Sequence, residues 1–130
     1  MDLPDGLIAL LQQPSQCFLA TSMADGSPHL TQTWADTDGE HILINSALGF
    51  QKIRNLERDP RVAVNILDPD NPFRYYAIRG HVLSITTEGA AEHIDKVALR
   101  YTGAPYSWYP GQTQTRVLLT IQADRISYTG

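Results

Sequence analysis

Apolar and polar residues alternate with a period of two along several short stretches of the chain, and this pattern predicts β-strands. Residues 61–67 show it most clearly, with Val62, Val64 and Ile66 on one face. In residues 28–35 two sets of side chains alternate, namely Leu30, Gln32 and Trp34 against His29, Thr31 and Thr33. The strands predicted in this way span residues 17–23, 28–35, 41–45, 61–67, 73–86 and 115–123, and residues 124–129 are expected to form a frayed end.

Two Asp-Gly dipeptides, at residues 25–26 and 38–39, separate the first three predicted strands. Each dipeptide is a hairpin signal, so we expect these three strands to form an antiparallel meander. Residues 73–86 are too long for one straight strand. Gly80 lies near their middle, and it predicts a bend or a bulge there.

A period near 3.6 predicts three helices, over residues 3–11, 50–59 and 88–101. The apolar stripe of the last helix consists of Ala91, Ile94, Ala98 and Tyr101. Thr87 is its expected N-cap. Six short strands in hairpins with few helices predict a mainly β fold. The expected architecture is a small six-stranded antiparallel β-barrel with helices packed outside.

The length of 130 residues fits a single domain, residues 1–130, with one core. A net charge of −4 and a pI of about 5.4 argue against nucleic acid as a partner, because phosphate backbones require clustered Lys and Arg. Apolar runs such as residues 18–20 are far too short to cross a membrane. Cys17 is the single cysteine, no Asn-x-Ser/Thr sequon is present, and the N-terminus lacks the basic region of a signal peptide. Together these features predict a cytoplasmic location.

The start of the predicted helix at residues 50–59 carries two cations, Lys52 and Arg54, where first turns usually carry Asp or Glu. No acidic residue occurs between His41 and Leu56, although the net charge of the chain is −4. A helix N-terminus already offers free backbone N–H groups and partial positive charge. Added cations therefore favour a bound anion, most commonly phosphate. The alternative is that both side chains are solvated surface cations.

The remaining residues do not favour metal or hydrolase chemistry. The histidines His29, His41, His81 and His93 are scattered, and none stands four residues from another. There is no Gly-x-Ser-x-Gly elbow, no P-loop and no dinucleotide-binding fingerprint. If the protein is an enzyme, we therefore expect an organic cofactor to carry the chemistry.

Aromatic side chains cluster in residues 73–76 and 101–109, and the second cluster includes Tyr106, Trp108 and Tyr109. Core filling explains part of them. Those in or beside predicted loops suit a planar heteroaromatic ligand in a cleft.

The order of several motifs is similar to that of a known family. The motifs are Asp25-Gly-Ser-Pro-His-Leu-Thr-Gln-Thr-Trp34, Ile44-Asn-Ser46, Lys52-Ile-Arg-Asn-Leu-Glu-Arg-Asp-Pro-Arg-Val62, Arg74-Tyr-Tyr-Ala-Ile-Arg-Gly80 and Arg116-Val-Leu-Leu-Thr-Ile121. Together they cover nearly the whole chain and resemble the pyridoxamine 5′-phosphate oxidase-like (PPOX class) flavin and deazaflavin oxidoreductases. Within that family the resemblance points to the actinobacterial coenzyme F420-dependent branch, the FDOR-B group.

The resemblance implies a split β-barrel of the FMN-binding type, which forms a homodimer with two cofactor sites between the protomers. By position, Lys52 would hold the cofactor phosphate, helped by Ser46 and Arg54. Gln32 and Thr33 would run beside the flavin-type ring, and Phe73 and Tyr75 would reach the site from the other protomer. The implied cofactor-binding residues are Gln32, Thr33, Asn45, Ser46, Lys52, Arg54, Phe73 and Tyr75.

The resemblance also implies the reaction, a hydride transfer between reduced F420 and an electrophilic conjugated small-molecule acceptor. This reaction needs no protein nucleophile, so no catalytic residue is assigned. Two alternatives stay open at this point. One is an oxidoreductase of the same fold that binds FMN, and the other is a protein that binds or carries F420 without turnover.

Overall fold

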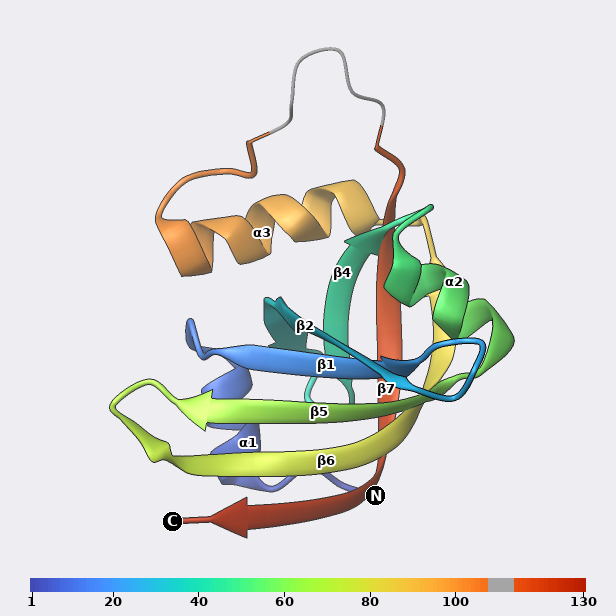
Figure 1. The fold of residues 1–130 in the computed structure, drawn as a ribbon. Coiled ribbons are helices and arrows are strands. Elements are labelled where there is room, and N and C mark those ends of the chain that lie inside the picture. The colour runs from blue at the N-terminus through green and yellow to red at the C-terminus, as the bar shows by residue number, and fades with distance from the viewer. Residues whose placement is uncertain (108–113) are drawn as a thin grey trace.

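The computed structural model describes residues 1–107 and 114–130, which form a curled antiparallel sheet with helices around it (Figure 1). The sheet has seven strands in the order β2-β1-β5-β6-β7-β4-β3. The strands are β1 (Cys17–Ser22), β2 (Pro28–Thr33), β3 (Ala35–Thr37), β4 (Ile42–Ala47), β5 (Arg61–Asp68), β6 (Asn71–Thr86) and β7 (Arg116–Thr129), and the helices are α1 (Asp5–Leu11), α2 (Gln51–Arg58) and α3 (Ala90–Thr102). The predicted mainly β split-barrel architecture is confirmed.

The chain passes from one edge of the sheet to the other at Trp34. β2 pairs with β1 at one edge, and β3, which begins directly after Trp34, pairs with β4 at the other edge. A single residue therefore joins the two edges and closes the curled sheet into a split barrel. For this reason the strand predicted over residues 28–35 is two strands, and the sheet has one strand more than the predicted six. Both predicted Asp-Gly hairpins form, β1 with β2 and β3 with β4, but they do not join into one meander, because β4 pairs with β3 and β7 instead of β2.

β6 is irregular where the sequence predicts it. Its register with β7 shifts between Arg79 and Gly80. A Cβ at residue 80 would collide with the backbone carbonyl oxygen of Gln122, so the glycine allows β7 to approach closely. The prediction of a frayed end at residues 124–129 is wrong, because the long β6 offers a pairing partner as far as Thr129.

The helices cover the barrel and help to fill its core. α2 buries Ile53 and Leu56, as predicted, and ends before Pro60. α3 starts two residues later than predicted and follows Gly89, which has φ +71 and no side-chain cap. Thr87 is therefore not the N-cap, because the left-handed backbone at glycine provides the entry to the helix instead. In the described ranges, no helix is long and apolar enough to cross a membrane.

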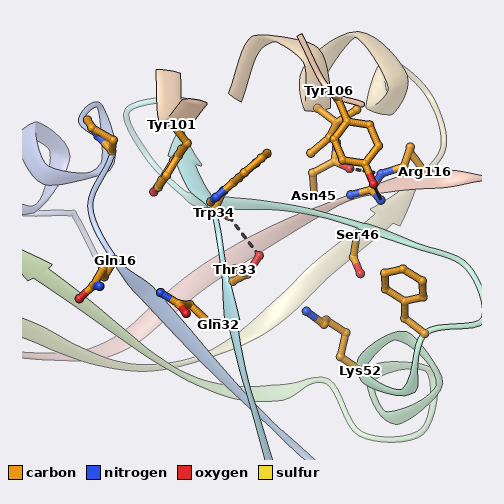
Figure 2. Close-up of a pocket in the computed structure, with 13 residues that line it drawn as sticks. Gln16, Gln32, Thr33, Trp34, Asn45, Ser46, Lys52, Tyr101, Tyr106 and Arg116 are labelled. Atoms are coloured by element: carbon orange, nitrogen blue, oxygen red, sulfur yellow. Dashed lines mark hydrogen bonds between the residues drawn. The ribbon is translucent and has the colours of Figure 1, made fainter. Parts of the chain in front are cut away.

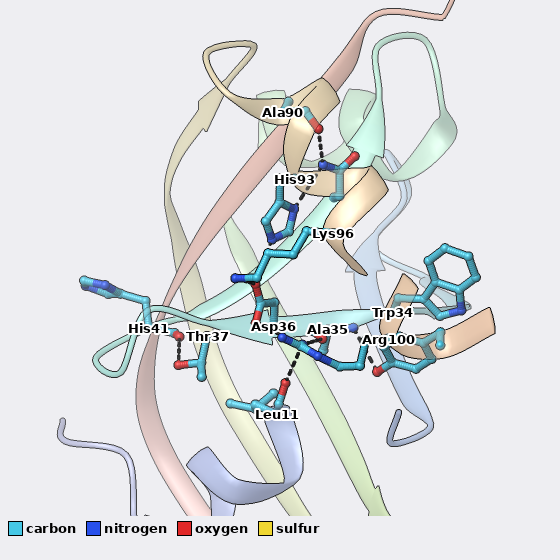
Figure 3. A network of polar contacts seen from close by, with 12 residues as sticks. Leu11, Trp34, Ala35, Asp36, Thr37, His41, Ala90, His93, Lys96 and Arg100 are labelled. Carbon is cyan, nitrogen blue, oxygen red and sulfur yellow. Dashed lines mark hydrogen bonds and ion pairs between the residues drawn. The ribbon is translucent and has the colours of Figure 1, made fainter. Parts of the chain in front are cut away.

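Asp36 on β3 anchors α3 to the sheet (Figure 3). The residue is 1% exposed, and its carboxylate lies 3.0 Å from His93 Nε2, 3.2 Å from Lys96 Nζ and 3.0 Å from Arg100 Nη1. Burial alone would raise the pKa of Asp36, but hydrogen bonds from His93, the Thr37 backbone and Arg100 outweigh it. The pKa of Asp36 therefore lies well below its ordinary value, and the carboxylate is charged in the folded protein.

We expect Asp36→Asn to lower the free energy of unfolding by about 2 kcal/mol, because His93 and Arg100, whose side chains are largely buried, lose a charged acceptor. Since the folded-state pKa is depressed, the contribution of Asp36 is fully present above the unfolded pKa of about 3.9 and is lost as pH falls towards the folded value. Chemical denaturation of the wild type and Asp36→Asn between pH 7 and pH 2 tests this. The difference in stability between the two proteins should shrink on acidification, and a constant difference would contradict the assignment.

Candidate functional site

A pocket of about 480 Å³ opens beside the crossing at Trp34, where β2, β4, α2 and α3 meet (Figure 2). Its walls come from segments that are far apart in the sequence and are brought together by the closure of the barrel. The lining residues are Pro14, Gln16, Gln32, Thr33, Trp34, Asn45, Ser46, Phe50, Lys52, Ile94, Tyr101, Tyr106 and Arg116.

Two cations line this pocket without an acidic partner. Lys52 lies in the first turn of α2, and Arg116, which begins β7, is 8% exposed. Among the described residues neither forms an ion pair and no Asp or Glu lines the pocket, while residues 108–113 include no acidic residue in the sequence. Burial lowers the pKa of both side chains, and the charge of Arg116 lowers the pKa of Lys52 further. A bound anion would relieve this repulsion between desolvated like charges.

Cys17 lies near Lys52 but does not supply the missing negative charge. Burial raises the pKa of the Cys17 thiol to about 12, although the charge of Lys52 acts in the opposite direction. The thiol is therefore protonated and neutral at physiological pH. Lys52 keeps its positive charge available for a ligand.

Ser46 presents a buried hydroxyl to the same part of the pocket. The residue is 2% exposed, and its Oγ has no hydrogen-bond partner within residues 1–107 and 114–130. It precedes Ala47, the cross-strand neighbour of Arg116, and Figure 2 shows its hydroxyl group between Lys52 and Arg116. An unpaired buried hydroxyl costs free energy, and an oxyanion bound here would provide its acceptor. The ammonium, guanidinium and hydroxyl donors together fit a phosphate group.

An aromatic wall lies away from Lys52 (Figure 2). The rings of Trp34 and Tyr101 stack with centroids 5.3 Å apart and an interplanar angle of 18°. The hydroxyl of Tyr101 donates to the Ser15 carbonyl at 2.6 Å and accepts from the Ala35 N–H at 3.2 Å, so the Tyr101 ring, on which Trp34 stacks, is held in place. A flat wall of this kind suits a planar heteroaromatic ring.

Five of the predicted cofactor-binding residues line the pocket, and these are Gln32, Thr33, Asn45, Ser46 and Lys52. Arg54 does not line it, and its Nη2 donates to Gln51 Oε1 at 2.7 Å on the exposed side of α2. Two helical positions separate Arg54 from Lys52, which turns its side chain by about 200° around the axis. Phe73 and Tyr75 do not line the pocket either, and both lie on β6, where Phe73 is 83% exposed.

Three residues that line this pocket were not predicted from the sequence, and these are Arg116, Trp34 and Tyr101. Arg116 lies near the start of the strand predicted over residues 115–123. The sequence pattern does not show that this strand pairs with β4. Trp34 and Tyr101 fitted the predicted strand and helix patterns, so nothing set them apart from core residues. Tyr106 lines the pocket, as its position near a loop suggested, whereas Trp108 and Tyr109 lie outside the described residues.

A second hollow, the outer groove, lies on the face of the sheet formed by β2, β1, β5, β6 and β7. It has a volume of about 490 Å³. Its exposed and half-exposed members include Phe18, Ala20, Leu30, Ala63, Ala77, Arg79 and Arg125. Gln32 pairs directly with Phe18, so the face that carries the outer groove continues into the wall of the pocket.

The chain is similar to one known family and to several solved structures. The sequence profile of the family described as pyridoxamine 5′-phosphate oxidase matches residues 3–130. A solved structure named F420 reductase is 33% identical with a TM-score of 0.83, and the match covers 96% of this chain and 98% of that chain. A conserved hypothetical protein from Mycobacterium tuberculosis is 31% identical with a TM-score of 0.75, over 98% of this chain and 84% of that chain. No curated protein matches the chain.

Proposed function

Because this chain belongs to the pyridoxamine 5′-phosphate oxidase family, we propose that it is an F420-dependent oxidoreductase, which transfers a hydride between reduced F420 and an electrophilic conjugated small molecule. The fold is that of flavin and deazaflavin oxidoreductases, and the similarity to an F420 reductase favours the deazaflavin. The observation that carries the proposal concerns the described residues 1–107 and 114–130. Among them, Lys52 and Arg116 have no acidic partner in the pocket, and the neighbouring Ser46 hydroxyl has no hydrogen-bond partner.

The residues of the pocket would bind and orient the cofactor. Lys52, Arg116 and Ser46 would hold its phosphate by charge-assisted hydrogen bonds. Gln32 and Thr33 would lie along the ring, and Trp34 would exclude water from one side of it. Bound F420 supplies the hydride chemistry, and the protein contributes affinity, orientation and electrostatics. No side chain is assigned as proton donor.

The proposal includes a homodimer in which a second copy covers the outer groove. Its apolar centre suits burial, and because its face continues to Gln32, a second copy docked there would border the pocket. Tyr75, Ala77 and Arg79 alternate along β6 and therefore share this face. Phe73 follows the same alternation and is 83% exposed, as expected for a side chain that contacts a partner. This arrangement would let Phe73 and Tyr75 act at the site of the other protomer.

Titration of the purified protein with oxidised F420 and with FMN tests the cofactor. We expect a colourless protein that binds F420 with a dissociation constant in the micromolar range and binds FMN more weakly. It should also reduce a quinone or enone when supplied with reduced F420. A protein that is yellow as purified would identify the FMN alternative. Binding of F420 without reduction of any acceptor would identify a carrier, and binding of neither dye would refute the proposal.

A further inference from the structure

We propose that His93, which lies behind the pocket on α3, is a positioning residue for the anionic group of the ligand. Through Asn45, it fixes the direction in which Arg116 points into the pocket. The inference rests on the proposed function, in which that anionic group is the cofactor phosphate. His93 does not line the pocket itself, so its effect passes through two other side chains.

Asn45 is 7% exposed, and its hydrogen bonds admit one orientation of its amide. Its Oδ1 lies 2.9 Å from Arg116 Nε, and its Nδ2 lies 2.7 Å from the carbonyl oxygen of Ala90. An arginine can only donate and a backbone carbonyl can only accept. The amide oxygen must therefore face Arg116, and the amide NH₂ group must face α3. Asn45 thus acts on the ligand by holding Arg116.

The orientation of Asn45 also determines the tautomer of His93. The same NH₂ group lies 3.1 Å from His93 Nδ1, so Nδ1 must offer its lone pair. The ring proton is then on Nε2, 3.0 Å from the Asp36 carboxylate, which accepts it. Asp36 is held in turn by Lys96 and Arg100. A continuous chain of hydrogen bonds therefore runs from Asp36 through His93 and Asn45 to Arg116 (Figure 3 shows its part on α3).

Arg116 depends on this support because its other contacts are weaker. Its Nη1 lies 3.4 Å from the Tyr106 hydroxyl and 3.3 Å from Gln114 Oε1, and its guanidinium lies 5.0 Å from the centre of the Tyr106 ring. The bond to Asn45 is shorter, at 2.9 Å, and is made by Nε, which leaves the end of the guanidinium directed at the ligand. Without a fixed Asn45, the guanidinium would have to be ordered when the ligand binds, which weakens binding.

The test separates affinity for the phosphate from affinity for the rest of the cofactor. Wild type, His93→Leu and His93→Gln are titrated calorimetrically with F420 and with the F420 chromophore whose ribityl chain ends in a hydroxyl instead of the phosphate. We expect His93→Leu to bind F420 about tenfold more weakly and to bind the phosphate-free chromophore as the wild type does. His93→Gln should restore F420 binding, because its amide can accept from Asn45 and donate to Asp36.

Lys96→Ala is the matched control, since Lys96 also contacts Asp36 but does not contact Asn45. It should leave the affinity for F420 unchanged even if it lowers stability. Equal F420 affinity in wild type and His93→Leu would overturn the inference, and so would an equal loss with both ligands. If the wild type binds neither ligand, the proposed function fails instead.

A measurement on the wild type keeps the inference testable if His93→Leu does not fold. Nitrogen-15 NMR of the His93 ring at neutral pH should show the neutral tautomer with its proton on Nε2. A proton on Nδ1 would overturn the inference, because the amide of Asn45 could not then direct its NH₂ group at His93 and its oxygen at Arg116.

Discussion

Lys52→Ala should lower the affinity of the protein for F420 by about 10- to 150-fold, which corresponds to about 1.5–3 kcal/mol for a charge-assisted hydrogen bond to phosphate. Lys52 is half-buried, has no ion pair among the described residues and faces the same space as Ser46 and Arg116. Fluorescence titration with F420 measures the change directly.

The stability of the protein should respond in a different way. Burial and Arg116 both lower the pKa of Lys52, so the charged side chain is unfavourable in the free protein. Its removal should leave the melting temperature unchanged or raise it slightly. Arg54→Ala is the matched control, because Arg54 carries the same charge on the same helix but contacts Gln51 outside the pocket. A sharp drop in melting temperature with unchanged affinity would show that Lys52 is structural.

The phosphate end of the pocket could be predicted in part because its signals are local. A helix that carries Lys52 but no acid in its first turn is visible in the sequence, and so is the neighbouring Ser46. Arg116 could not be found in this way, because it reaches the pocket through the pairing of β7 with β4, a contact between distant parts of the chain. The same limit explains why the support that Asn45 gives to Arg116 could not be predicted. Its partners on α3 and β7 are far from it in the sequence.

The strand pattern was predictable for a similar reason, and it failed where the backbone changes partner. Alternation continues smoothly from β2 through Trp34 into β3, so the pattern gives no sign that β2 and β3 belong to opposite edges of the sheet. Gly80 was informative because a bend in a long strand has a local signature. The closure at Trp34 positions the pocket, and it is a property of the whole sheet.

Ala63→Arg should convert the proposed homodimer into a monomer, with the dimer dissociation constant raised at least about 100-fold. Ala63 is exposed in the outer groove and lies in a row with Ala20, Arg79 and Arg125 across four strands. A new arginine would place three like charges side by side on a face that a two-fold axis would press against its own copy. Light scattering after size exclusion at micromolar concentration should give 14.5 kDa for the variant and twice that mass for the wild type.

The same variant tests whether the cofactor site is shared between protomers. If Phe73 and Tyr75 act across the interface, Ala63→Arg should also weaken F420 binding, although residue 63 lies outside the pocket. Ala91 was predicted to lie on the apolar stripe of α3, but Ala90 is buried in its place and Ala91 is exposed. Ala91→Arg should therefore change neither the mass nor the affinity. A monomeric wild type would refute the dimer. If Ala63→Arg is still a dimer, the interface lies on another face of the protein. If the variant is a monomer with full affinity for F420, one protomer completes the site alone.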